Sequence, residues 1–153
     1  MILWSLLAIV IIALDQLTKQ WVISNIGVTD SLKIIPGVID FVCVKNKGAA
    51  FSFLADKNYG IIILSVISLV FCAGVVWYLI KNKPQSKLFI LSLVMMFAGA
   101  LANVIDRIFR GFVVDFIETE FVNFPVFNIA DISITVGAVL VIVYILFFDK
   151  KNA

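Results

Sequence analysis

The chain has 153 residues, of which 63% are hydrophobic and 14% charged, whereas a soluble domain carries about 25% charged residues. The excess of apolar side chains must face lipid, and only helices or closed barrels cross a bilayer, so the composition excludes an ordinary soluble protein. The net charge of +2 without a basic patch argues against nucleic acid as a partner, and the absence of histidine excludes Ser-His-Asp and Cys-His catalysis and nearly every zinc site.

Four unbroken apolar segments are long enough to cross a membrane as helices. A hydrocarbon core of about 30 Å needs about 20 helical residues at about 1.5 Å each. The first segment has no basic region before it and no small-residue cleavage site after it, so we interpret it as a retained span rather than a cleaved signal. We expect a single integral membrane domain over residues 1–153, with transmembrane helices at about 2–23, 59–80, 87–105 and 129–148.

The lysines between the spans predict the orientation of the chain in the membrane. The connection at residues 81–87 has three lysines and no acid, and two more lysines follow the fourth span. Basic loops stay in the cytoplasm, so we expect both termini there and segments 24–58 and 106–128 on the outer side. Four lysines in the first outer segment weaken this bias, although three aspartates accompany them.

The first outer segment contains two β-prone runs on either side of a turn. Residues 32–35 and 38–44 are rich in valine, isoleucine and phenylalanine, and Pro36 and Gly37 separate them. Such runs around a Pro-Gly turn predict a small sheet. The expected fold is therefore an all-α membrane protein of four transmembrane helices with a small β-rich outer segment.

Ionisable residues gather near one end of the first and third spans. An ionisable side chain in a span costs about 2.5 to 3.5 kcal/mol on insertion scales, so each one is a candidate functional residue. Asp15 and Lys19 lie four residues apart on one helix face, which indicates either a self-neutralising ion pair or support for a site. At the end of the third span, Asn103 and Asp106 precede Arg107, which is suited to bidentate bonding with a carboxylate. The alternative for Asp106 and Arg107 is a solvated helix end.

Two further aspartates follow in the second outer segment and at the start of the fourth span. Asp115 lies within an apolar extended stretch, and Asp131 follows Asn128 with the spacing of a capping box. A capping role for Asp131 is compatible with catalysis. If Asp115 and Asp131 meet in a partly dry cleft, they cannot both ionise cheaply, so the pair holds a proton near neutral pH. One carboxylate then activates water against a peptide carbon while its partner acts as an acid, and which residue plays which part stays open.

Five blocks of sequence follow one another in a characteristic order. They are Asp-Gln-Leu-Thr-Lys at 15–19, Asn-Lys-Gly-Ala-Ala-Phe-Ser at 46–52, Gly-Ala-Leu-Ala-Asn-Val-Ile-Asp-Arg at 99–107, Val-Val-Asp-Phe at 113–116 and Phe-Asn-Ile-Ala-Asp at 127–131. On a chain with four spans, these blocks together resemble the bacterial lipoprotein signal peptidases, or signal peptidase II. One block alone is a weak signal, but five in register are specific.

The resemblance implies an aspartic endopeptidase of the bacterial cytoplasmic membrane with its active site near the outer face. Its substrate would be a prolipoprotein whose cysteine already carries diacylglycerol, and the cut would fall before that cysteine. No cofactor and no metal are implied, the partners are lipid-modified signal peptides and membrane lipid, and the oligomeric state is left open with a monomer favoured. The resemblance implies a catalytic dyad of Asp115 and Asp131, supported by Asp15, Lys19, Asn46, Asn103, Arg107, Asn128 and Ala130.

Two further residues are candidates for the site because of their chemical character and their place in the sequence. Asp106 belongs to the polar cluster that ends the third span, and Gly48 lies in the block 46–53, whose small residues suit a close approach to an extended peptide. The alternative for that block is an ordinary outer turn.

Two other functions compete with the peptidase: a transporter whose buried charges form a relay across the membrane, and a scaffold protein that binds a partner through its outer sheet. A relay predicts polar residues at several depths, and a scaffold leaves Asp115 unexplained.

Overall fold

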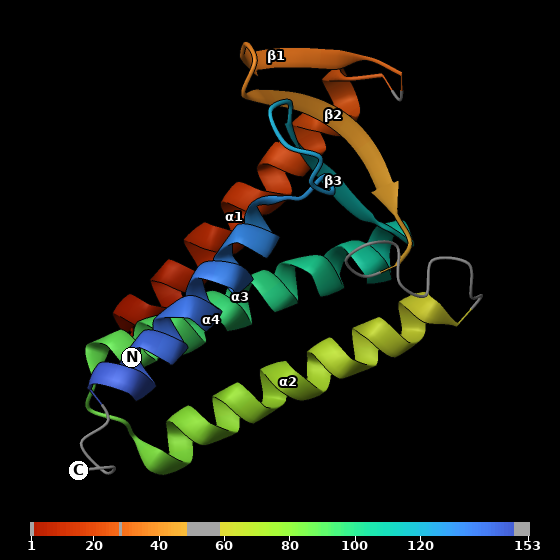
Figure 1. The fold of residues 1–153 in the computed structure, drawn as a ribbon. Helices are drawn as coiled ribbons and strands as arrows, with labels where there is room; N and C mark the ends of the chain where they lie inside the picture. The colour runs from red at the N-terminus through yellow and green to blue at the C-terminus, as the bar shows by residue number, and fades with distance from the viewer. Residues whose placement is uncertain (1, 28, 49–58, 149–153) are drawn as a thin grey trace.

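The computed structural model describes residues 2–27, 29–48 and 59–148 of the chain (Figure 1). In these residues four helices are long and apolar enough to cross a membrane, and three strands form a small sheet. The predicted fold class, four transmembrane helices with a small β-rich segment, is confirmed. The elements are α1 (Ile2–Asn25), β1 (Ser31–Ile35), β2 (Ile39–Asn46), α2 (Gly60–Asn82), α3 (Lys87–Arg110), β3 (Val113–Thr119) and α4 (Ile129–Phe147).

Local sequence signals set the ends of α3 and α4. The Ser86 side chain caps the start of α3 by accepting the Phe89 N–H, and α3 ends where Gly111 adopts a positive φ of 75°. The helix therefore continues beyond residue 105, where the apolar pattern predicted its end, because Gly111 supplies the stop. Asn128 and Asp131 form the predicted capping box at the start of α4.

Helix α3 lies at the centre of the bundle and packs against the other three helices (Figure 1). Two glycines allow the close contact between α3 and α4. A Cβ atom at Gly137 would lie 2.7 Å from the Ser92 carbonyl oxygen, and one at Gly99 would overlap the Ala130 carbonyl oxygen. The Ser133 hydroxyl also donates to the Met95 carbonyl across this contact, at 2.9 Å. The first turn of α4 is thereby held directly on α3.

The sheet is antiparallel with the strand order β1-β2-β3. The turn between β1 and β2 contains Gly37 with a φ of 76°, as the Pro-Gly pair predicted. Strand β3 was not predicted as a strand, and it pairs with β2 so that Asp115 lies opposite Val44. The sheet packs against the C-terminal part of α1 through a buried apolar cluster of Val22, Ile26, Cys43, Val114, Phe116 and Ile117.

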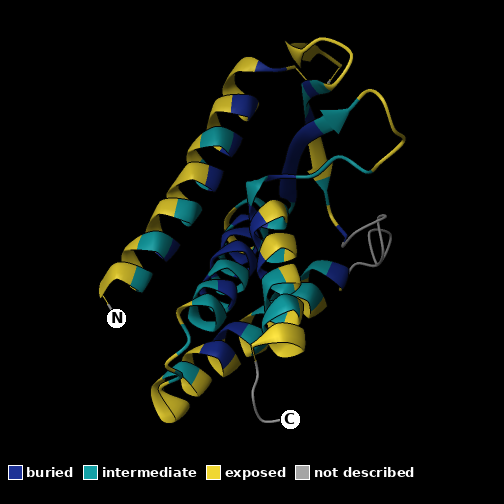
Figure 2. Ribbon diagram, turned by 60° about the vertical axis from the view of Figure 1, so that its left-hand side comes forward, coloured by how far each residue is buried: buried dark blue, intermediate teal, exposed yellow. Residues whose placement is uncertain are grey.

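We call the end of the bundle that carries this sheet the sheet end. The C-terminal ends of α1 and α3 and the N-terminal end of α4 meet there, whereas the N-terminal end of α1 and the C-terminal end of α4 lie at the opposite end (Figure 1). Figure 2 shows exposed residues along the outward faces of the helices and buried residues where the elements face one another. Large apolar side chains such as Leu6, Val70 and Ile142 are among those exposed, as expected for helices that face lipid.

The glycine contact between α3 and α4 leads to a first prediction. Gly99→Ala should lower the stability of the protein by about 1 to 3 kcal/mol, because the added methyl group meets the Ala130 backbone and Ile134. Gly74→Ala in α2 is the matched control, since nothing lies within 4 Å of its Cβ position; it should be neutral or stabilising by up to about 1 kcal/mol. Thermal melts in detergent measure both. Equal melting temperatures for the two variants would contradict the close approach.

Candidate active site

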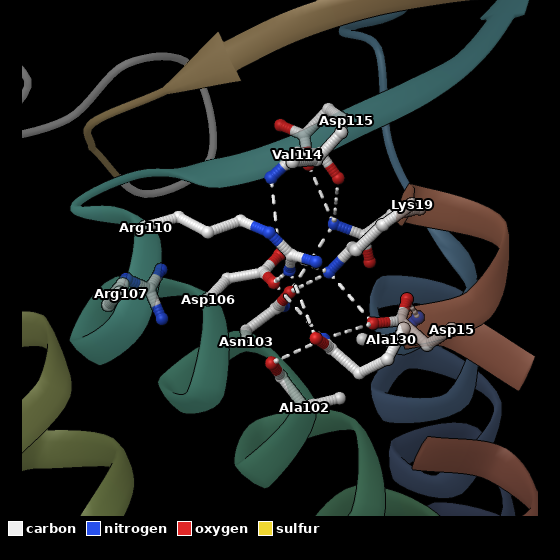
Figure 3. Close-up of polar contacts among 12 residues, drawn as sticks. Asp15, Lys19, Ala102, Asn103, Asp106, Arg107, Arg110, Val114, Asp115 and Ala130 are labelled. Atoms are coloured by element: carbon white, nitrogen blue, oxygen red, sulfur yellow. Dashed lines mark hydrogen bonds and ion pairs between the residues drawn. The ribbon is translucent and has the colours of Figure 1, made fainter. Parts of the chain in front are cut away.

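A buried lysine lies at the centre of the polar residues at the sheet end (Figure 3). The Lys19 ammonium donates to Asp15 Oδ2 at 2.8 Å, to Asp106 Oδ2 at 2.8 Å and to Asn103 Oδ1 at 2.9 Å. An ammonium has three donors, so all of them are used. Lys19, Asp15 and Asp106 are fully buried. The pair predicted within α1 therefore exists and is part of a larger group, which we call the lysine cluster: Asp15, Lys19, Asn103 and Asp106.

The two carboxylates of the lysine cluster also bind backbone N–H groups of other elements. Asp15 Oδ1 accepts the Ala130 N–H at 2.9 Å, and Asp106 Oδ2 accepts the Val114 N–H at 3.2 Å. Ala130 belongs to α4 and Val114 to β3, so the cluster joins α1 and α3 to both elements. The alternative of a solvated helix end is wrong for Asp106, which α1 and β3 cover.

Two residues of this region were not predicted as part of the site. Arg110 forms an ion pair with Asp106, and Gln16 donates to Asp106 Oδ1 at 3.1 Å and to Asp15 Oδ2 at 3.3 Å. The sequence holds a signal for Arg110, because Asp106 and Arg110 have the same acid-before-base spacing as Asp15 and Lys19. The apolar pattern hid that signal, since it predicted the end of the helix before Arg110.

Asp115 is 3% exposed, and each of its carboxylate oxygens accepts a hydrogen bond from an asparagine amide. Asn128 Nδ2 donates to Oδ1 at 2.6 Å, and Asn46 Nδ2 donates to Oδ2 at 2.9 Å. The Asn46 amide is oriented in turn by Gly48, whose N–H donates to Asn46 Oδ1 at 2.8 Å. Because Gly48 binds the side-chain oxygen of Asn46, the side-chain NH₂ group of Asn46 faces the Asp115 carboxylate.

Asp131 is half-buried in the first turn of α4 and is held in a similar way. Asn103 Nδ2 donates to Asp131 Oδ1 at 2.9 Å, and the Asn128 backbone N–H donates to Oδ2 at 3.2 Å. Because Asn103 Oδ1 faces the ammonium of Lys19, its Nδ2 must face Asp131. The predicted cap is present, and it leaves Asp131 among the polar groups of the site.

One residue, Asn128, binds both aspartates. Its side-chain oxygen accepts the Asp131 N–H at 2.9 Å, its backbone N–H donates to Asp131, and its side-chain amide donates to Asp115. The fold thus brings together two carboxyl groups that are 16 positions apart in the sequence. Burial raises the pKa of Asp115 to about 6, and the charge of Asp131 adds to this rise, while the amide donors of Asn46 and Asn128 limit it.

Arg107 does not form the predicted bidentate contact with a carboxylate. Among the described residues, its Nη2 donates to the Gly48 carbonyl oxygen at 3.5 Å, and its buried Nε has no hydrogen-bond partner. Figure 3 shows its side chain beside the hydrogen-bond network without a contact to it. Asp106, the carboxylate next to Arg107 in sequence, is paired with Lys19 and Arg110 instead. The rest of the block after Gly48, residues 49–53, lies outside the described residues.

The carboxylates of the site are engaged by lysine, arginine and amide donors. Within residues 2–27, 29–48 and 59–148, no three carboxylate or thiol side chains gather in a way that could hold a metal ion. The fold and the site together define a multi-pass membrane protein with a pair of carboxyl groups at one end of its helical bundle.

Comparison with known proteins identifies the family. The sequence model described as Signal peptidase (SPase) II matches residues 7–147, and the chain belongs to this family of membrane peptidases. It is 46% identical over 151 residues to the lipoprotein signal peptidase of Lactococcus lactis subsp. lactis (strain IL1403), covering 98% of this chain and 97% of that protein. It is 39% identical over 143 residues to that of Streptococcus thermophilus (strain CNRZ 1066), covering 94% and 91%.

Solved structures have the same fold. A bacterial membrane enzyme determined by the in meso method at 2.3 Å superposes with a TM-score of 0.88 and 33% identity, covering 98% of this chain and 92% of that one. A second, determined by the same method at 1.9 Å, gives a TM-score of 0.84 at 34% identity, covering 96% and 94%. The resemblance to signal peptidase II predicted from the five sequence blocks is therefore confirmed.

The hydrogen bonds of Asp115 lead to a second prediction. Asn46→Leu should raise the pKa of Asp115 above its value of about 6. The Asn46 amide donor stabilises the ionised carboxylate in the wild type, and the variant lacks this donor. The measurement is the pH titration of the Asp115 carboxyl carbon by NMR, assigned by comparison with Asp115→Asn. Asn82→Leu is the control, since the Asn82 amide bonds the Tyr78 carbonyl within the distant helix α2. An unchanged or lowered pKa in Asn46→Leu would contradict the role of this hydrogen bond.

Proposed function

We propose that this protein is an intramembrane aspartyl endopeptidase that removes the signal peptide from diacylglyceryl-modified prolipoproteins, cutting before the lipidated cysteine. The observation that carries the proposal is the joint contact of Asn128 with Asp115 and Asp131. Family membership supports a peptidase, and the relatives named lipoprotein signal peptidase support the class of substrate.

In the proposed reaction, the two aspartates share one proton. The ionised carboxylate takes a proton from a water molecule while the oxygen of that water attacks the peptide carbon. The protonated carboxyl group donates its proton to the carbonyl oxygen of the peptide. Collapse of the tetrahedral intermediate breaks the C–N bond: the carboxyl group that took the proton from water passes it to the leaving nitrogen, and the other carboxylate recovers its proton from a hydroxyl group of the intermediate. The rise of the Asp115 pKa to about 6 supports this scheme, because it brings protonation of the pair closer to neutral pH than that of a free aspartate. The two roles are assigned to the pair and not to either residue.

The surroundings of the pair suit a substrate held at the membrane surface. The site lies where the ends of α1, α3 and α4 meet the sheet, so an apolar signal helix can stay among the lipid-facing helices while its end reaches the carboxyl groups. Gly48 and the Nε of Arg107, which has no hydrogen-bond partner within the described part of the chain, offer backbone and guanidinium groups beside the pair. We propose that these groups bind the extended backbone of the peptide.

The site belongs on the outer side of the membrane in this proposal. The basic connection at residues 81–87, the N-terminal end of α1 and the C-terminal end of α4 lie at the end of the bundle opposite to the sheet (Figure 1). If basic loops stay in the cytoplasm, the sheet end faces outward. This orientation suits a substrate that receives its lipid before it is cut.

The transporter alternative lacks the polar path that it requires. Among the described residues, the buried ionisable side chains lie in the lysine cluster, at Asp115 and at Asp40 of the sheet, all towards the sheet end. Ser92 and Ser133 are buried elsewhere in α3 and α4, and the Ser92 hydroxyl donates to a carbonyl of its own helix while Ser133 donates across to α3. A relay of charges across the bundle is therefore disfavoured.

The dyad itself gives the third prediction. Asp115→Asn and Asp131→Asn should each abolish cleavage while the protein stays inserted and folded, because an amide can neither accept the proton of water nor deliver one as an acid. The double variant should lose little more than either single variant, since the two residues act as one unit. The measurement is single-turnover cleavage of a diacylglyceryl prolipoprotein in detergent, followed by the mass of the product.

The matched control is Asp40→Asn, which changes another buried aspartate on the same sheet that lies outside the proposed site. It should retain full cleavage. Asparagine at position 131 keeps much of the capping ability of aspartate, so thermal melts should show little change. Near-normal turnover by a folded Asp131→Asn protein would falsify the dyad and leave this residue as a cap alone.

The orientation gives the fourth prediction. Reporter domains fused after Lys83 and at the C-terminus should read as cytoplasmic, and those inserted near Asp40 and Glu120 should read as external, because of the three lysines at residues 81–87. Protease accessibility of whole cells and of inverted vesicles gives an independent measurement. A cytoplasmic reading at Glu120 would remove the outer site and the proposed access of a lipidated precursor.

A further inference from the structure

The lysine cluster binds the backbone next to each proposed catalytic residue. Asp15 accepts the N–H of Ala130, the residue before Asp131, and Asp106 accepts the N–H of Val114, the residue before Asp115. Lys19 contacts both acids at 2.8 Å and so couples the two attachments. The distance between the two proposed catalytic aspartates therefore depends on the positions of the side chains in the lysine cluster.

The free edge of β3 is fixed on both sides of Asp115. Strand β3 lies at the edge of the sheet, so its outward N–H groups have no partner strand. The Val114 N–H is bound by Asp106, and two residues further along the same edge the Phe116 N–H is bound by the Phe127 carbonyl at 3.0 Å. Asp115 lies between these two attachments. If the Asp106 attachment moved, one side of Asp115 would be released.

Charge balance explains why Asp106 needs a second cation. Lys19 is shared between two carboxylates, which would leave one negative charge of the cluster uncompensated in a buried site. Arg110 supplies the missing charge through its ion pair with Asp106. Its side chain is 19% exposed; its Nη1, which contacts Asp106, also donates to the Gln16 side-chain oxygen at 3.0 Å, while its Nη2 donates to the Gln20 side-chain oxygen at 3.3 Å on the exposed side.

We propose that Arg110 is a positioning residue for the reaction: it holds Asp106 against the Val114 N–H and thereby sets the place of the Asp115 carboxyl group. This inference rests on the proposed function for its effect on turnover. Arg110 contacts neither aspartate of the dyad in any contact that the structure gives, so it acts through Asp106 and the strand. A misplacement of about 1 Å costs about 100-fold in rate, so the loss should appear in kcat and not in KM.

The test compares Arg110→Met, Arg110→Lys and Gln20→Ala in the full-length protein in detergent, with cleavage of a diacylglyceryl prolipoprotein as the assay. Arg110→Met should lower kcat by about tenfold to 100-fold with KM within about twofold, and it should speed the hydrogen exchange of the Val114 amide. Arg110→Lys should recover most of kcat, because it keeps the charge beside Asp106. Gln20→Ala removes only the contact from the far side of the guanidinium and should match the wild type in all these measurements.

The outcomes separate this inference from the proposed function. Unchanged kcat and unchanged Val114 exchange in a folded Arg110→Met protein would overturn it, as would a rise in KM alone, which indicates a substrate contact. A lower melting temperature with normal kcat would make Arg110 merely structural. If Arg110→Met does not fold, Arg110→Gln takes its place, because it also removes the charge beside Asp106, and unchanged kcat and unchanged Val114 exchange in that variant would overturn the inference. Should the wild type not cleave the precursor at all, the proposed function fails, whereas Val114 exchange still tests the attachment.

Discussion

The burial of one ammonium group governs the arrangement of this site. Lys19 lies in a helix that faces lipid on its other sides, and an unpaired charge there would cost several kcal/mol. Its three donors are each satisfied by a different side chain, from α1 and from α3. The two carboxylates in turn bind the backbone of α4 and β3, so the lysine cluster joins four elements. Folding of the sheet end is thus coupled to formation of the site.

Three asparagine side chains orient the carboxylates of Asp115 and Asp131 through hydrogen bonds. An amide has a donor end and an acceptor end, so fixing one end determines what the other presents. Lys19 fixes Asn103, the helix start fixes Asn128 and Gly48 fixes Asn46. In each case the donor end then faces a carboxylate of the aspartate pair. Both aspartates are held in defined orientations by neutral groups, which leaves their charge free for chemistry.

Close packing between α3 and α4 also constrains the position of the site, in addition to its hydrogen bonds and ion pairs. Gly99 meets the Ala130 backbone, whose N–H binds Asp15 and whose neighbour is Asp131. A larger residue at position 99 would push the first turn of α4 away from Asp15 and Asn103 together. Close packing of small residues is a common means of joining membrane helices, and here it determines the position of a polar site. Helix α2, which packs mainly against α3, contributes none of these polar contacts.

The sequence by itself determined the four spans, the hairpin around Gly37, the cap at Asn128 and the Asp15–Lys19 pair, because each depends on apolarity or spacing within a short stretch. The tertiary structure alone decided that β3 is a strand, that Asp106 binds Lys19 and Arg110, and that Arg107 bonds Gly48 instead of a carboxylate. It also decided that Asp115 and Asp131 both bind Asn128. The hydrogen bonds of the site join residues up to 115 positions apart, as between Asp15 and Ala130, and the choice of partner depends on distances and amide orientations that exist only once helices and sheet have packed.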